Sequence, residues 1–206
     1  MVESQQIASI SNWKPIRRIQ WFTLVWMVLE VAIALTAAIR SRSVALAAFG
    51  GDSAIELFSA GVVLWRFHSA EKQAEQTASK ITGWLLIALA VYIAFNSLYT
   101  LIAATSKPQP SYLGIVLLVA AAFVMPWLAR RKRHLAAAAD SRSLRADATQ
   151  SSICGYMAWI ALVGLLLNAF GHFAWADPVA ALGLLPIVIQ EAKEALEGKE
   201  CCGNYK

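Results

Sequence analysis

The residues with the clearest chemical potential are two carboxylates inside one long apolar stretch. Asp52 and Glu56 are the only charged residues between Ser43 and Trp65. Four residues apart, they would lie on one face of a helix, one turn from each other. A carboxylate in the hydrocarbon of a membrane costs about 2.5–3.5 kcal/mol on insertion scales. We therefore expect a proton, a cation or a basic side chain to compensate the pair.

A second interpretation of the same stretch needs no function. Ser53-Ala54-Ile55-Glu56 matches the S-x-x-E capping box, with Gly50 and Gly51 in a preceding loop. The helix would then keep an apolar length of only about a dozen residues, which is too short to span a bilayer. The apolar run 44–49 would also belong to no predicted helix. We favour a membrane helix that runs through both carboxylates.

A second group of polar residues opens the apolar segment 145–170. Asp147, Gln150, Ser151 and Cys154 follow one another at steps of one to three residues, so they would form a stripe along one face of a helix. Structural explanations exist for two of them. Asp147 could cap a helix or pair with a nearby arginine, and Cys154 could be a small buried apolar side chain.

A further carboxylate, Glu30, lies near the middle of the first apolar segment. Carboxylates together with a thiolate suit a divalent metal ion, and a cysteine ligand favours zinc or another softer metal. Ligands must lose their protons to bind a metal, whereas an apolar environment favours the protonated carboxyl group. A site that holds protons when empty and releases them to a metal is half of a proton antiporter.

The elements that position these residues belong to an integral membrane protein. Of 206 residues, 58% are hydrophobic and 15% are charged, against about 25% charged in ordinary soluble domains. The net charge of +5 lies between the apolar segments, so we expect the lipid bilayer and no nucleic acid as partner. The three cysteines form no disulfide framework, and no cleavable signal peptide is expected.

The apolar segments predict an all-α, polytopic fold, a single transmembrane domain over 1–206 with a short tail at 198–206. Six spanning helices are expected, at about 19–40, 43–67, 81–105, 112–129, 145–170 and 174–197. With a cytoplasmic N-terminus, fifteen Lys and Arg residues fall on the inner side and three on the outer side. Both termini are therefore predicted to be cytoplasmic, in the plasma (inner) membrane.

The connecting segments carry further signals. The segment 130–144 is expected to be a basic loop that sets the topology, although contact with anionic lipid or metal handling through His134 stays open. Asp177-Pro178 has the pattern of an N-cap followed by proline at the first helical position. Near the C-terminus, possible cytosolic metal loading is assigned to Glu200, Cys201 and Cys202. Palmitoylation or no role at all are the alternatives for this tail.

These features together resemble the cation diffusion facilitator family of metal/proton antiporters. The stretch 51–57 is similar to the family's helix-two motif, in which a His or Asp is followed four residues later by Asp. The stretch 145–148 is similar to the opening of helix five, and 175–182 to the start of helix six. The resemblance covers about 19–197. It implies a homodimer that works by alternating access.

The chain departs from the family pattern in helix five, where the motif is His and then Asp, four residues apart. Gln150 and Cys154 stand at those positions. Because a neutral glutamine is a poor ligand, the family's four-ligand tetrahedral zinc site is not preserved. The cytoplasmic metal-binding domain that usually follows helix six is absent from the sequence, so the resemblance implies a short, divergent branch.

We therefore predict a secondary transporter that exports a divalent metal cation, zinc above all, from the cytoplasm by proton antiport. No enzymatic activity and no resident cofactor are expected. The predicted metal ligands are Asp52, Glu56, Cys154 and Asp147, and the auxiliary or proton-relay residues are Glu30, Gln150 and Ser151. The alternative is a non-transporting membrane metal sensor or regulatory protein that kept the scaffold while Gln150 replaced a ligand.

Overall fold

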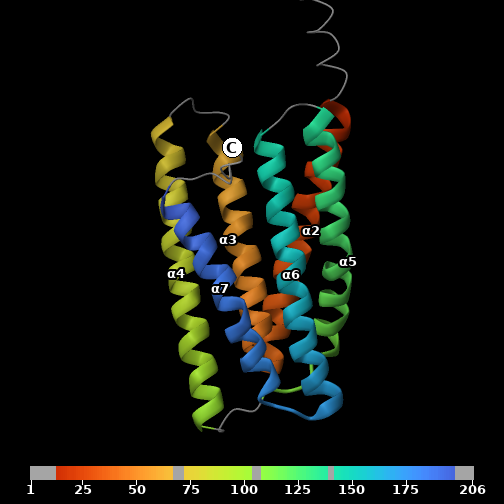
Figure 1. Ribbon diagram of the computed structural model, residues 1–206, viewed down its shortest axis with the longest axis vertical. Coiled ribbons are helices and arrows are strands. Elements are labelled where there is room, and N and C mark those ends of the chain that lie inside the picture. Colours follow the sequence, from red (N-terminus) through yellow and green to blue (C-terminus); the bar gives the residue numbers. More distant parts are fainter. Residues whose placement is uncertain (1–12, 67–71, 104–107, 139–141, 198–206) are drawn as a thin grey trace, which may run out of the picture.

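The computed structural model describes residues 13–66, 72–103, 108–138 and 142–197. This part of the chain contains six helices and no strand, which confirms the predicted all-α fold. The helices are α2 (Trp13–Ser41), α3 (Val44–Arg66), α4 (Lys72–Ala103), α5 (Tyr112–Ala138), α6 (Arg142–Gly171) and α7 (Ala176–Leu196). They run side by side in one bundle, and α2 begins at the same end at which α7 finishes (Figure 1). Which side of the membrane this end faces stays a prediction.

Several helices extend beyond the apolar segments that predicted them. α2 begins at Trp13, α4 begins at Lys72, and α5 continues to Ala138. The expectation of a loop over 130–144 is therefore wrong for most of its length, since the helix ends only at Ala138. The physical reason is that helix hydrogen bonding does not need an apolar environment, and Leu135 and the alanines after it are strong helix formers.

Helix α3 lies at the centre of the bundle, in contact with α2, α4, α6 and α7. Its neighbours approach closely because the contact positions are small, as in many membrane bundles. A β-carbon at Gly50 would lie only 2.8 Å from the β-carbon of Ala34 on α2. A β-carbon at Gly164 on α6 would collide with the β-carbon of Ala180 on α7. The inner helices are thus held at a short distance around the polar residues of α3.

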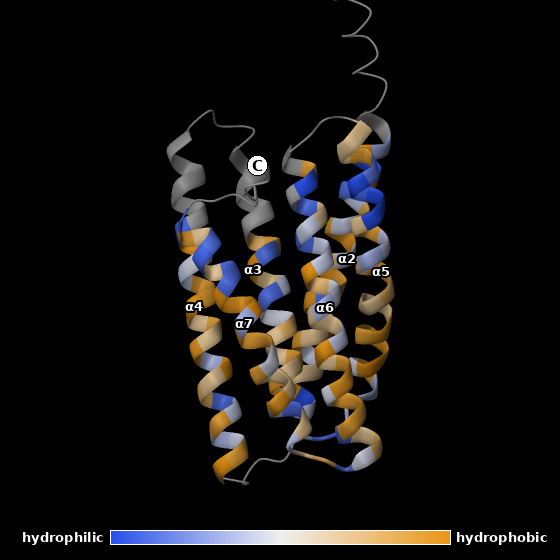
Figure 2. Ribbon diagram, in the orientation of Figure 1, coloured by the Kyte–Doolittle hydropathy of each residue, from blue (hydrophilic) through white to orange (hydrophobic). Residues whose placement is uncertain are grey.

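Four helices of the described residues are long and apolar enough to cross a membrane. These spans are Pro15–Ser41, Lys80–Ile102, Tyr112–Ala138 and Asp147–Gly171, on α2, α4, α5 and α6. Hydrophobic residues dominate the middle of α4 and α5, and hydrophilic ones gather at one end of α5 and α6 (Figure 2). The other two helices, α3 and α7, carry the buried acidic residues Asp52, Asp177 and Glu191.

Asp177 does not cap its own helix. The N-cap position of α7 is Trp175, which makes no side-chain capping hydrogen bond. The Asp177 carboxylate instead accepts hydrogen bonds from the Ser43 hydroxyl at 2.5 Å and from the Val44 backbone N–H at 2.8 Å. These groups lie at the start of α3, where the first N–H groups have no partner within the helix. The predicted N-cap role of Asp177 is therefore wrong for α7, because the carboxylate caps α3.

Candidate metal site

Asp52 and Glu56 lie well inside α3, which begins at Val44. The capping-box interpretation of Ser53 to Glu56 is therefore wrong, and the helix runs through both carboxylates. The preceding glycines are helical and serve close packing, as the short approach of Gly50 to Ala34 indicates. The apolar run 44–49 that the capping interpretation left without a place forms the first turns of the helix.

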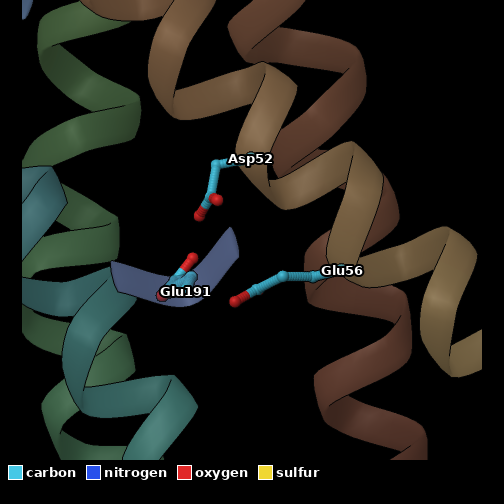
Figure 3. Close-up of side chains that lie close together, drawn as sticks. All are labelled: Asp52, Glu56 and Glu191. Atoms are coloured by element: carbon cyan, nitrogen blue, oxygen red, sulfur yellow. The ribbon is translucent and has the colours of Figure 1, made fainter. Parts of the chain in front are cut away.

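A third carboxylate, Glu191 on α7, joins this pair. Figure 3 shows the side chains of Asp52, Glu56 and Glu191 pointing into one common space between α3 and α7. One ligand oxygen from each lies within 4.8 Å of the others. Three oxygens all at that limit have a common centre about 2.8 Å from each, so calcium–oxygen bonds of about 2.3–2.6 Å need a contraction of a few tenths of an ångström. Zinc–oxygen bonds of about 2.0–2.2 Å need a larger contraction, of about 0.6–0.8 Å from the same limit.

The three carboxylates are largely buried, and no described basic side chain pairs with them. Asp52 is 1% exposed and Glu191 is 8% exposed, and Glu56 is half-buried. Among the side chains that the structure describes, no lysine or arginine forms an ion pair with any of the three. The Oδ1 atom of Asp52 is buried without a hydrogen-bond partner there. Buried charges are normally paired or bound to metal, so this arrangement fits a cation or shared protons.

Gln150 on α6 lies beside the same carboxylates. Its Nε2 group donates a short hydrogen bond to Glu56 Oε1 and one of 3.1 Å to Glu191 Oε1. The amide therefore connects α6 to both α3 and α7. The Gln150 side chain also has a carbonyl oxygen, which is a possible fourth oxygen ligand.

Cys154 and Glu30 form a separate contact next to this group. Glu30 is fully buried and accepts hydrogen bonds from Trp26 Nε1 at 2.6 Å and from Ser53 Oγ at 2.9 Å. The Cys154 thiol donates to the Glu30 carboxylate at 3.4 Å. Because Ser53 follows Asp52 in the chain, Glu30 lies adjacent to the three-carboxylate group without belonging to it.

Asp147 is held by a different partner from those the sequence suggested. Its Oδ1 atom lies 2.8 Å from the Lys132 ammonium of α5, and its Oδ2 atom accepts a hydrogen bond of 2.9 Å from Gln20. Lys132 also donates to Ser151 Oγ at 2.9 Å. The structure thus places Asp147 and Ser151 around a lysine, whereas the sequence offered Arg142 or Arg145 as the partner of Asp147.

One cavity of about 100 Å³ links these groups. All four residues of the predicted α6 stripe line it, together with Glu56 and Lys132. The predicted site residues Glu200, Cys201 and Cys202 lie outside the described residues. The structure therefore brings Asp52, Glu56 and Gln150 together at Glu191, and it places Cys154, Asp147 and Ser151 along the adjoining cavity.

The family model of the cation efflux transmembrane domain matches residues 21–196. The chain belongs to the cation efflux family. The predicted resemblance is thereby confirmed, and membership of this family supports transport of a metal cation across a membrane. No curated protein matches the chain.

Two residues of this cation efflux domain were missed by the sequence reasoning. Glu191 stands among polar residues near the end of the last apolar segment, and apolar length alone does not single it out. Its spacing from Leu184 and Val188 places it on the buried face of α7. Lys132 was counted with the basic loop, although four-residue steps from Leu128 place it on the buried face of α5. Following the helical periodicity to the end of the last segment, and past the end of the fourth, would have found both.

Proposed function

We propose that this protein exports a divalent metal cation through the group formed by Asp52, Glu56 and Glu191, in exchange for protons. The observation that carries the proposal is the convergence of three carboxylate oxygens within 4.8 Å, inside a bundle and without a basic partner in the described residues. Three like charges so close together are unfavourable unless a cation or protons neutralise them. A divalent ion satisfies this requirement when bound, and protons satisfy it when the ion has left.

Proton exchange is supported by the closeness of the carboxyl groups themselves. One carboxylate oxygen of Asp52 and one of Glu191 lie within 4.8 Å of each other, and both side chains are buried. Two buried carboxyl groups this close repel each other unless one of them carries a proton or both bind a cation. A metal ion that takes both groups as ligands must displace this proton, because the ligand form of a carboxylate is deprotonated. Glu30, hydrogen-bonded to Ser53 beside Asp52, is proposed as the group that receives or supplies protons.

Zinc is the proposed cargo, with manganese as its competitor. A given set of ligands generally binds zinc more tightly than manganese, whereas an all-oxygen set is the ligand type that suits manganese. The Cys154 thiol, predicted as a softer ligand, contacts Glu30 and lines the cavity beside Glu56. We propose that it supports Glu30 and that Gln150 contributes the remaining oxygen at the metal.

Zinc uptake into everted membrane vesicles tests the proposal. With an acidified lumen, vesicles that contain the protein should accumulate radioactive zinc, and collapse of the pH gradient should stop the uptake. The Asp52→Asn, Glu56→Gln double variant should take up no more than vesicles without the protein. An unchanged uptake rate in that variant would remove the proposed site.

A metal sensor or regulator on the same scaffold is the competing function. It is favoured by one observation, the Gln150 amide that already donates hydrogen bonds to two of the carboxylates. A sensor binds metal without moving it. Purified protein in liposomes distinguishes the two functions, since only a transporter carries metal into the lumen and changes the pH there.

A further inference from the structure

Lys132 is the residue of the basic run 130–133 that points into the bundle. It is 0% exposed, whereas its three arginine neighbours are exposed. Within the described residues it is the single buried cationic side chain, against the buried acids Glu30, Asp52, Asp177 and Glu191. A buried ammonium is costly unless it is paired, so its position calls for a specific partner.

The present partner of Lys132 leaves it free to make another contact. The ammonium donates to Asp147 Oδ1 at 2.8 Å and to Ser151 Oγ at 2.9 Å. Lysine has three donor hydrogens, so one remains. Asp147 is 34% exposed and also accepts a hydrogen bond from Gln20. Asp147 would therefore keep water and Gln20 as partners if the ammonium moved away.

The cavity gives the ammonium a path to the proposed metal site. Lys132 and Glu56 line the same space of about 100 Å³. That volume corresponds to about three water molecules at about 30 Å³ each. The flexible four-carbon stem of lysine allows its charge to shift within such a space.

We propose that Lys132 is an internal counter-cation that competes with the transported metal for Glu56. In this structure the ammonium lies on Asp147; when Glu56 is ionised and holds no metal ion, the ammonium crosses the cavity to neutralise it, and an arriving metal ion returns it to Asp147. The inference rests on the proposed function and deepens it, since it names the group that stabilises the empty site and lowers the cost of metal release.

Zinc binding to the purified full-length chain in detergent micelles tests the competition. Lys132→Gln removes the competitor, so zinc should bind about tenfold more tightly. Asp147→Asn removes the alternative partner and holds the ammonium at Glu56, so zinc should bind several-fold more weakly. Arg133→Gln is the matched control, because Arg133 is exposed and contacts Ser152, and it should not change the affinity. If the Lys132–Asp147 ion pair is only structural, Lys132→Gln and Asp147→Asn should change the zinc affinity in the same direction. That result would overturn the inference.

A cycle with Glu56 tests the contact itself and does not depend on the folding of Asp147→Asn. In a Glu56→Gln background, Lys132→Gln should change zinc affinity by less than twofold, because the competed group is gone. If the Lys132 charge instead stays in place and acts at a distance on all three carboxylates, Lys132→Gln should still change zinc affinity about tenfold in the Glu56→Gln background. That result would overturn the inference. Failure of the unmodified protein to bind zinc or manganese would overturn the proposed function as well. Binding by that protein with an unchanged Lys132→Gln affinity would overturn the inference alone.

Discussion

Replacing Glu191 by glutamine should weaken metal binding while leaving the metal-free fold intact. The substitution keeps the volume and one oxygen of the side chain and removes one negative charge from a group whose ligand atoms lie within 4.8 Å of one another. Two unit charges 4 Å apart interact by about 4 kcal/mol at an effective dielectric constant of about 20. In the empty site protons relieve part of this repulsion among the carboxylates, and in the loaded site each ionised carboxylate is instead attracted to the metal ion.

Glu191→Gln therefore destabilises the metal-bound site and stabilises the metal-free site. Loss of attraction to a divalent ion is partly offset by relief of the repulsion in the empty site. We expect a net loss of about 1.4–2.8 kcal/mol, which is ten- to hundredfold weaker binding. The metal-free variant should unfold at the same temperature as the unmodified protein or higher, because a buried like-charge contact has been removed.

Calorimetric titration with zinc and manganese in detergent micelles measures the affinity, and thermal unfolding in a chelator measures the metal-free stability. Glu194→Gln is the matched control on the same helix. Glu194 accepts a hydrogen bond from Gln190 at 3.1 Å and lies outside the three-carboxylate group, so its substitution should change affinity by less than twofold. Equal affinities for Glu191→Gln and Glu194→Gln would refute the assignment of Glu191 as a ligand.

The remaining predictions concern packing, capping and ligand choice. Gly164→Ala should lower the free energy of unfolding by about 1–3 kcal/mol, because its β-carbon would collide with Ala180. Gly183→Ala is the control and should leave that free energy unchanged, since its β-carbon would meet Ile160 at an ordinary 3.5 Å. Equal melting temperatures for the two variants would contradict this packing. Asp177→Ala should lower the free energy of unfolding by about 1–2 kcal/mol, because it removes the cap of α3. Hydrogen exchange at the Val44 amide should become faster, and an unchanged exchange rate would contradict the capping role. Cys154→Ser should leave the bound zinc-to-manganese ratio within twofold in metal analysis of the purified protein, and a larger shift would return the thiol to the ligand set.

The membrane helices and the first two carboxylates were predictable because each rests on a local pattern. Apolar length predicts a spanning helix, and Asp52 and Glu56 are conspicuous because nothing else in their segment is charged. The extent of the helices was less predictable. Polar sequence such as 130–138 continues α5 without any change in hydrophobicity that marks its end.

The partners of the site residues could not be predicted, because they come from other helices. Asp147 pairs with Lys132 on α5, while the sequence suggested only arginines close to Asp147 along the chain. Asp177 caps a helix more than a hundred residues earlier in the sequence. Glu191 reaches Asp52 through the packing of α7 against α3, which no spacing within one segment encodes. Helical periodicity predicts which residues face inward, and the tertiary packing decides which of them meet.

Simultaneous recording of metal and proton movement in proteoliposomes tests the central claim most directly. An inward zinc gradient should carry zinc into liposomes that contain the unmodified protein, and the lumen should become more alkaline as protons leave in exchange. The Asp52→Asn, Glu56→Gln double variant should show neither change. Zinc entry at an unchanged rate through the double variant, or zinc binding by the unmodified protein with no movement of either ion, would contradict the account.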